Sequence, residues 1–311
     1  MFFKKDIVDK EEQKGLYVEV NDLIEQRNFL PYIRRYQNKI TSDQAGDVRS
    51  AFKGRGMEFE EVREYGYGDD VRDIDWRVTA RKGNTYTKVF AEEKDREVYV
   101  VLDLSSYMMF GTKKELKSVS AAKLAALLGW RSLENKDRFG LILINDKETK
   151  VFKPQSSQKN LMTIFKAISE MSKQMYEKGL DKKRTSINTI RKEILSSLQF
   201  SIKGHAMVFI LSDFKYINNK KALVTLAKRC RVYCVNIYDF IEDVPPPSAE
   251  YMAEYNGERV VFDTSSEAFK RTYFYYFQDK RKEMENFCKK FKCYYIGIRT
   301  DKPLYKQLKI L

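Results

Sequence analysis

The chain has 311 residues and a formal net charge of +14, from 58 lysines and arginines against 44 aspartates and glutamates. Hydrophobic residues make up 43% of it and aromatic residues 14%, which is enough for a packed core in one large domain or two modest ones. Its longest apolar stretches, such as residues 124–130, are far shorter than the roughly 20 residues of a membrane span, and its first residues lack the apolar stretch of a secretory signal. We therefore expect no membrane span and a cytoplasmic location.

Neither the positive charge nor the cysteines predict a dedicated nucleic-acid or zinc site. Basic residues are dispersed among acidic ones, and common nucleic-acid-binding motifs are absent from the sequence. This distribution favours a solvated, lysine-rich surface over a nucleic-acid-binding face. The cysteines lack the spacing of zinc ligands, so we expect reduced, buried thiols at Cys230, Cys234, Cys288 and Cys293.

The residue pattern divides the chain into three parts. Residues 14–42 carry apolar side chains at near-helical spacing, which predicts an N-terminal helical arm over residues 1–44. Glycines punctuate short alternating stretches such as 85–90, which predicts a loop-rich, partly β subdomain over residues 45–97. The remainder, residues 98–311, forms the third part.

In residues 98–311, continuous hydrophobic runs alternate with segments of helical periodicity. The predicted strands are 98–102, 139–144, 207–211, 232–237 and 294–298. The predicted helices are 116–134, 159–178, 187–198, 220–230 and 267–291. Such alternation predicts an α/β fold of the doubly wound kind, with a mostly parallel sheet covered by helices on both faces.

Oxygen-bearing side chains follow two of these strands. Asp103 and Ser105 follow the first strand, Asp213 follows the third, and Thr185 precedes the helix that leads into the third strand. If the two strands are neighbours, these side chains meet at the carboxyl edge of the sheet, where open α/β sheets bind ligands. Two carboxylates with hydroxyls suit an Mg²⁺ or Mn²⁺ ion. The alternative is that Asp103 and Ser105 only cap the turn after the strand.

A second polar cluster lies in residues 54–81, GRGMEFEEVREYGYGDDVRDIDWRVTAR. One interpretation is an internal salt-bridge lattice with apolar anchors that dock the segment onto the α/β body. The alternative is a metal-dependent phosphodiesterase or nuclease site, in which the carboxylates hold ions and arginines bind phosphate. Some of the side chains are also candidates for partner binding: Arg63, Tyr65, Asp69, Asp70, Arg72, Asp73, Asp75, Trp76 and Arg81.

The strand-end pattern resembles the metal-ion-dependent adhesion site of a von Willebrand factor A domain. With the 54–81 segment, and with the runs Lys136-Asp137-Arg138-Phe139-Gly140 and Ile210-Leu211-Ser212-Asp213-Phe214, the chain resembles the bacterial domain of unknown function 58 family. The resemblance implies metal ligands at Asp103, Ser105, Thr185 and Asp213. It also shows a departure, because Tyr107 stands where the family's site has a second ligand serine, and a phenol is a poor neutral Mg²⁺ ligand.

The resemblance implies a non-enzymatic function. A member of this family is expected to act as an adaptor or co-chaperone of a MoxR-type AAA+ ATPase in the assembly or remodelling of client proteins, or in metal insertion. The sequence contains no nucleotide-binding loop, no nucleophile elbow and a single histidine, which favours binding over catalysis. A pure scaffold with a vestigial site is the remaining possibility, and Tyr107 is its best support.

Overall fold

The computed structural model describes residues 14–32, 57–92, 96–178, 202, 206–215, 221–255 and 258–308. The chain forms two compact units: Met1–Lys39 with Arg96–Leu311, and Ile40–Asp95. The N-terminal segment therefore belongs to the same unit as the α/β region. The finer boundaries at residues 44/45 and 97/98 stay a prediction.

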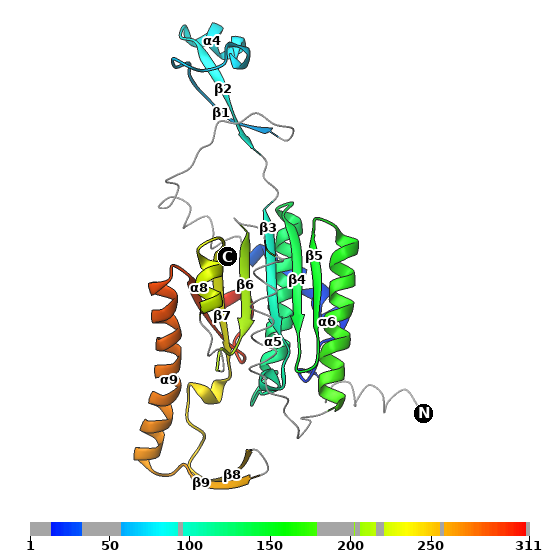
Figure 1. The fold of residues 1–311 in the computed structure, drawn as a ribbon, viewed down its shortest axis with the longest axis vertical. Helices are drawn as coiled ribbons and strands as arrows, with labels where there is room; N and C mark the ends of the chain where they lie inside the picture. Colours follow the sequence, from blue (N-terminus) through cyan, green and yellow to red (C-terminus); the bar gives the residue numbers. More distant parts are fainter. Residues whose placement is uncertain are drawn as a thin grey trace. The chain divides into compact units, whose positions relative to one another are not determined.

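Within the described residues, the larger unit is built on a six-stranded sheet (Figure 1). Its strands, in spatial order, are β10 (Tyr294–Arg299), β7 (Arg231–Tyr238), β6 (Met207–Ser212), β3 (Glu97–Asp103), β4 (Arg138–Ile144) and β5 (Thr149–Gln155). All neighbouring pairs are parallel except β4 with β5. The predicted mostly parallel sheet and its five hydrophobic strands are confirmed. The sequence analysis missed β5 because this edge strand is largely exposed and has no hydrophobic run.

Helices cover both faces of this sheet. The helices α5 (Lys117–Glu134) and α6 (Gln158–Lys178) lie on the face that receives Val98, Val100 and Leu102 of β3. The opposite face receives Tyr99 and Val101 and is covered by α8 (Lys221–Ala227) and α9 (Glu267–Lys290). Alternate residues of one strand thus enter two separate cores, which is why the buried strands read as unbroken apolar runs. The predicted helix at 187–198 lies outside the described residues.

The N-terminal segment is anchored on α5. It contains α2 (Val20–Glu25) and the 3-10 turn η1 (Gln26–Phe29). Leu23 is fully buried, and its carbonyl oxygen accepts a hydrogen bond of 3.1 Å from the Trp130 indole nitrogen of α5. Phe29 stacks on Tyr305, which belongs to the last helix, α10 (Leu304–Gln307).

Two further features complete the larger unit. A hairpin of β8 (Glu250–Tyr255) and β9 (Glu258–Asp263) precedes α9. The sequence did not predict it, because neither strand carries the long continuous apolar run of the buried strands. All four cysteines are free and buried, as predicted. In the part of the chain that the structure describes, no helix combines the length and apolar character needed to cross a membrane.

The smaller unit is a β hairpin with two short helices. Strand β1 (Met57–Glu64) pairs antiparallel with β2 (Tyr86–Glu92), and the connection holds the 3-10 turn η2 (Val71–Asp73) and α4 (Trp76–Lys82). The side chain of Asp75 accepts hydrogen bonds from two backbone N–H groups at the start of α4, and Gly83 ends that helix with a φ of 84°, a conformation that glycine adopts without strain. The predicted partly β character of this region is confirmed.

Candidate functional site

The parallel pairing of β3 with β6 brings the two predicted strand-end aspartates to one edge of the sheet. Leu102 pairs with Leu211, so Asp103 and Asp213 follow neighbouring strand positions. Both side chains are almost completely buried. The predicted meeting of these carboxylates at the carboxyl edge therefore follows from the strand order.

The carboxylate of Asp103 is held by its immediate surroundings. Its Oδ1 accepts the Ser105 N–H at 3.0 Å, and its Oδ2 accepts the Ser212 hydroxyl at 2.7 Å. The first bond closes the turn after β3, and the second ties that turn to the end of β6. Asp103 therefore performs the turn-capping role that the sequence analysis gave as the alternative to metal binding.

Ser105 and Ser106, which follow Asp103 and Leu104, carry hydroxyl groups that no described residue satisfies. The Oγ atoms of Ser105 and Ser106 are buried and have no hydrogen-bond partner in the described part of the chain. The Ser106 N–H, in contrast, donates to the carboxylate of Asp146 just after β4, at 3.1 Å. A buried hydroxyl without a partner is unfavourable, so these two oxygens stand out among the described residues of the edge.

Two other positions of the predicted metal site, Tyr107 and Thr185, add no described ligand. Tyr107 lies half-buried in the 3-10 turn η3 (Ser106–Met108). Thr185 lies outside the described residues.

A buried lysine that sequence reasoning missed stands beside Asp213. Lys117 is the first residue of α5, and its side chain has no solvent exposure. Its Nζ lies 3.1 Å from Asp213 Oδ2 and 3.1 Å from Oε1 of Glu242, in the 3-10 turn η4 (Phe240–Glu242). Burial by itself would lower the pKa of Lys117, but the two carboxylates outweigh it and raise the pKa above its ordinary value. Lys117 is therefore a fixed positive charge.

A second lysine balances the remaining negative charge. Lys215 Nζ lies 2.9 Å from the same Glu242 oxygen, and the Lys215 N–H donates to Asp213 Oδ1 at 3.2 Å. Asp213 and Glu242 thus face two ammonium groups, Lys117 and Lys215. The cluster is electrically neutral, and both oxygens of Asp213 are engaged.

These contacts test whether the residues suit a divalent cation. Mg²⁺ requires near-octahedral oxygen ligands at about 2.0–2.1 Å. Asp103 and Asp213 are both committed to internal donors, and an ion beside Asp213 would lie next to the Lys117 ammonium. No cluster of three His, Cys, Asp or Glu side chains suited to a metal occurs among the described residues. The described donors do not fit an Mg²⁺ or Mn²⁺ ion.

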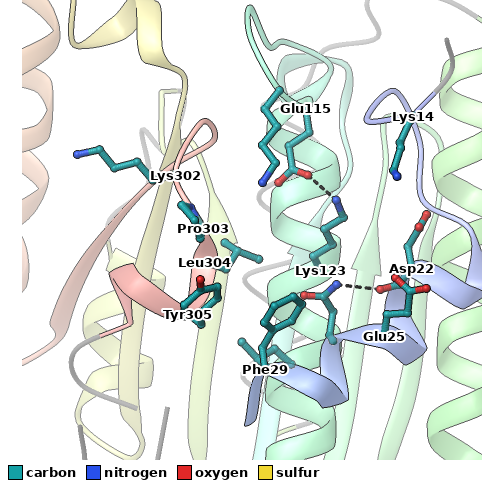
Figure 2. A pocket seen from close by; sticks show the side chains of 13 residues that line it. Lys14, Asp22, Glu25, Phe29, Glu115, Lys123, Lys302, Pro303, Leu304 and Tyr305 are labelled. Atoms are coloured by element: carbon teal, nitrogen blue, oxygen red, sulfur yellow. Dashed lines mark hydrogen bonds and ion pairs between the residues drawn. The ribbon is translucent and has the colours of Figure 1, made fainter. Parts of the chain in front are cut away.

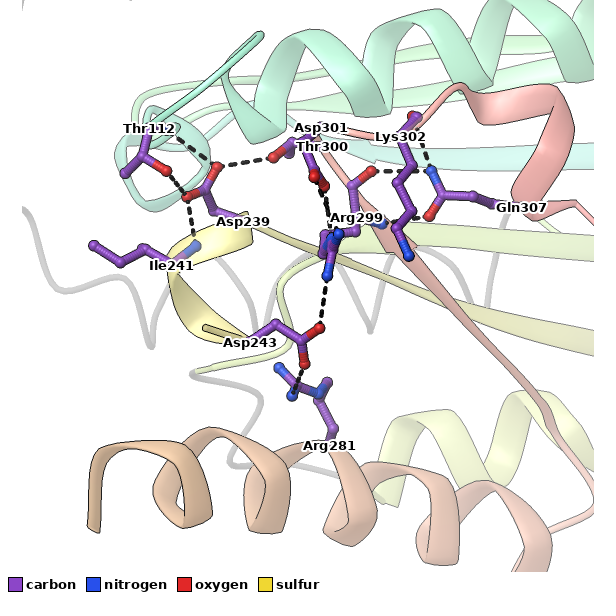
Figure 3. A network of polar contacts seen from close by, with 10 residues as sticks. All are labelled: Thr112, Asp239, Ile241, Asp243, Arg281, Arg299, Thr300, Asp301, Lys302 and Gln307. Carbon is purple, nitrogen blue, oxygen red and sulfur yellow. Dashed lines mark hydrogen bonds and ion pairs between the residues drawn. The ribbon is translucent and has the colours of Figure 1, made fainter. Parts of the chain in front are cut away.

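A hydrogen-bond network extends the edge across β7 and β10 (Figure 3). Asp239, fully buried after β7, accepts the Thr112 N–H at 3.1 Å, the Ile241 N–H at 3.1 Å and the Thr300 hydroxyl at 2.8 Å. The Thr112 hydroxyl also donates to it. Burial alone would raise the pKa of Asp239, but these hydrogen bonds hold the pKa below its ordinary value. Asp239 therefore fixes the loop after β3 against the ends of β7 and β10.

An adjoining ion-pair chain holds α9 to the same edge. Asp243 lies 2.9 Å from Arg281 of α9 and 2.8 Å from Arg299 of β10, and Arg299 also pairs with Asp301 at 2.6 Å (Figure 3). The Arg299 pKa is raised, first by its hydrogen bond to Asp301. These ion pairs tie the loop after β7 to α9 and to the end of β10.

The acidic residues of the smaller unit serve local roles. Asp69 lies 2.7 Å from Arg63 and accepts the Gly66 N–H at 2.8 Å, which lowers the pKa of Asp69. Tyr65 donates its hydroxyl to the Asp69 carbonyl oxygen. Asp70 caps η2 and lies 3.3 Å from Arg72.

The remaining side chains of that cluster fit the same arrangement. Asp75 caps α4 and lies 3.9 Å from Lys88, Asp73 is in η2, and Arg81 is in the last turn of α4. These contacts form a salt-bridge and capping lattice and give no geometric support to a two-ion phosphodiesterase. Trp76 is 70% exposed.

A cavity of about 300 Å³ lies elsewhere on the larger unit (Figure 2). Its lining combines opposite charges, such as Lys14 and Asp22, with the ring of Tyr305. Glu115 and Lys123 form an ion pair across part of it. The charges of this lining are mixed, and it holds none of the predicted site residues.

Comparison with known proteins identifies the family. Uncharacterized proteins from Mycobacterium bovis and Mycobacterium tuberculosis are 25% identical over 195 residues, which is 62% of this chain and 59% of theirs. The chain thus spans about three-fifths of the length of these relatives. A solved structure, the conserved hypothetical protein BatB from Bacteroides thetaiotaomicron, is 14% identical with a TM-score of 0.41, over 69% of this chain and 95% of that one. The family model described as protein of unknown function DUF58 matches residues 61–283, and the chain belongs to this family.

Proposed function

We propose that this chain is a non-enzymatic protein-binding module. It acts as an adaptor or co-chaperone of a MoxR-type AAA+ ATPase in the assembly or remodelling of a client protein, or in metal insertion, with the cytoplasm as its compartment. It docks through a degenerate adhesion site at the carboxyl edge of a von Willebrand factor A-like domain. The partner class comes from the family resemblance, and the docking edge comes from the geometry.

The observation that carries the proposal is the pair of unsatisfied hydroxyls at the edge. Ser105 and Ser106 place buried oxygens beside a set of polar loops. Binding sites are characteristically preorganised, with a few polar groups held for a ligand by surrounding contacts. The mostly parallel sheet, covered on both faces and ending in Asp103 and Asp213, supports the von Willebrand factor A-like assignment.

An exposed aromatic residue adjoins the hydroxyls and gives the edge an apolar contact. Phe110 lies in the loop after β3 and is 42% exposed, and its ring centroid lies 5.6 Å from Lys117 Nζ. Aromatic side chains surrounded by polar groups are typical anchors of protein interfaces. We assign the partner contact to this loop.

The smaller unit supplies a second contact surface. Tyr67, Val71 and Trp76 expose large apolar side chains among its charged residues. Such a cluster is unusual for a solvated face and typical of interface hot spots. It supports a partner-selecting role for the 54–81 segment.

The test is a calorimetric titration of the chain with a purified MoxR-type ATPase from the same organism. Phe110→Ala is expected to weaken binding at least tenfold, as the loss of an aromatic anchor does. Val151→Ala is the matched control, because Val151 is 47% exposed on the edge strand β5, away from the strand ends. Absence of binding by the wild-type chain, or equal binding by Phe110→Ala, would overturn the proposal.

A further inference from the structure

The position of Lys117 is electrostatically unusual. A lysine at a helix N-terminus faces the positive end of the helix dipole, and complete burial removes its hydration. Both effects disfavour the charged form. The ammonium is retained because Asp213 and Glu242 each lie 3.1 Å from it.

This arrangement places a positive charge beside Asp213, the last aspartate of the adhesion-type pattern. An ion bound to Asp213 at about 2.1 Å would lie within a few ångströms of the ammonium, and the two positive charges would repel. Lys215 adds a second ammonium, 2.9 Å from Oε1 of Glu242, the same oxygen that Lys117 contacts. The negative charge that would attract a cation is already neutralised.

The Asp103 carboxylate is unavailable to a cation for a different reason, because internal donors already occupy it. Each oxygen of Asp103 is engaged by an internal donor, the Ser212 hydroxyl and the Ser105 N–H. Among the described residues of this edge, the unsatisfied groups are the hydroxyls of Ser105 and Ser106, which can donate to or accept from a polar group of a protein partner directly.

We infer that Lys117 replaces the divalent cation of the adhesion site as a built-in positive charge, so that docking at this edge is independent of divalent cations. The inference has a metal half, that Lys117 stands in place of the ion, and a docking half, that partner binding needs no divalent cation. The docking half rests on the proposed function, and the metal half rests on the Lys117 contacts. The Phe110 ring, 5.6 Å from Nζ, lies over the ammonium and separates it further from solvent. The ammonium is part of the chain, whereas a bound ion is present only at sufficient ion concentration.

The metal half is tested on the chain alone. Mn²⁺ titration followed by electron paramagnetic resonance is expected to show no stoichiometric binding to the wild-type chain. Thermal unfolding of Lys117→Met is expected about 10 °C below wild type, because two buried carboxylates lose their shared partner. Added Mn²⁺ is expected to raise the unfolding temperature of this variant but not that of wild type.

Two further variants control this measurement. Lys123→Met removes another lysine from α5, one that is 24% exposed and pairs with Glu115. It is expected to shift the unfolding temperature much less, with no response to Mn²⁺. If Lys117→Met does not fold, Lys117→Met with Asp213→Asn and Glu242→Gln removes all three charges and should fold. Stoichiometric Mn²⁺ binding by wild type, lost in Asp213→Asn, would overturn the inference, and so would wild-type stability of Lys117→Met.

The docking half is tested by repeating the ATPase titration with excess EDTA and then with added Mg²⁺. The affinity is expected to be the same in both. Loss of binding in EDTA would overturn the inference while leaving the proposed function intact. Absence of binding in every condition would overturn the proposed function and the docking half, and the Mn²⁺ measurements would still decide whether Lys117 replaces the ion.

Discussion

The Nζ atom of Lys117 lies 3.1 Å from Asp213 Oδ2, with neither side chain more than 1% exposed. This contact joins the start of α5 to the end of β6. It places a buried cationic side chain beside Asp213 at the carboxyl edge of the sheet.

The first prediction concerns the strength of that contact. Asp213→Asn keeps the side-chain shape but removes one of the two negative charges that contact Lys117. Removing one partner of a buried ion pair typically lowers the free energy of unfolding by about 3 kcal/mol, and we expect a loss of this size. Urea unfolding of Asp213→Asn, Lys117→Met and the double variant measures the coupling between them. Additive effects would contradict a direct interaction.

The second prediction concerns the unsatisfied hydroxyl of Ser105. Because Ser105 Oγ has no partner within the described residues, Ser105→Ala is expected to leave the free energy of unfolding unchanged or slightly raised. Ser132→Ala is the matched control, since the buried Ser132 hydroxyl donates to the Leu128 carbonyl oxygen, and its loss should lower that free energy by about 1 kcal/mol. ATPase binding should weaken in Ser105→Ala and not in Ser132→Ala. A larger loss of unfolding free energy in Ser105→Ala than in Ser132→Ala would show that Ser105 has a structural role.

The third prediction is a pH dependence that arises from Asp239. Its pKa in the folded chain lies below the ordinary value of 3.8, so the ionised carboxylate stabilises the fold above that value and this stabilisation is lost as the pH falls through the lower, folded pKa. Asp239→Asn should lower the free energy of unfolding at neutral pH by about 2 kcal/mol. Urea unfolding at a series of pH values should show the gap between wild type and variant narrowing below about pH 4. A gap that is constant with pH would contradict the assigned ionisation.

The fourth prediction concerns the buried thiols. The neighbouring thiols of Cys288 and Cys293, together with burial, raise the pKa of Cys234 well above its ordinary value. Because the thiolate is the reactive form, Cys234 should resist alkylation by iodoacetamide in the native chain and react on unfolding in urea. Mass spectrometry of the alkylated peptides gives the rate for each cysteine. Fast native labelling of Cys234 would contradict its buried, protonated state.

The fifth prediction separates stability from binding in the smaller unit. Trp76 is 70% exposed, so Trp76→Ala should change the free energy of unfolding by less than about 0.5 kcal/mol. The same change should weaken ATPase binding if the 54–81 segment selects the partner. Arg72→Ala tests a nearby charged position of the same segment, and its stability should also change little, because the Arg72 ion pair with Asp70 is solvent-exposed. Unchanged binding by Trp76→Ala would remove this segment from the interface.

Much of the fold could be predicted because buried parallel strands leave a local signal. Continuous apolar runs identified β3, β4, β6, β7 and β10, and their order placed Asp103 and Asp213 together. The exposed edge strand β5 and the β8–β9 hairpin carry no such run. Their formation depends on the neighbouring strand, which a local pattern does not record.

The chemistry of the site was less predictable because it depends on long-range contacts. Lys117 is one lysine among many in this chain, and its partners Asp213 and Glu242 are 96 and 125 residues away in the sequence. Asp239 likewise contacts Thr112 across 127 residues. No spacing rule links such positions. In the smaller unit, the alternating charges predicted a lattice because their contacts are local, as between Arg63 and Asp69.

We propose that the partner docks at the carboxyl edge of the sheet. Hydrogen–deuterium exchange of the chain, free and bound to the MoxR-type ATPase, tests this docking. We expect slower amide exchange in the complex at residues 104–112, after β3, and around Asp213. Protection confined to other surfaces, with the loop that carries Ser105 and Phe110 exchanging as in the free chain, would contradict it.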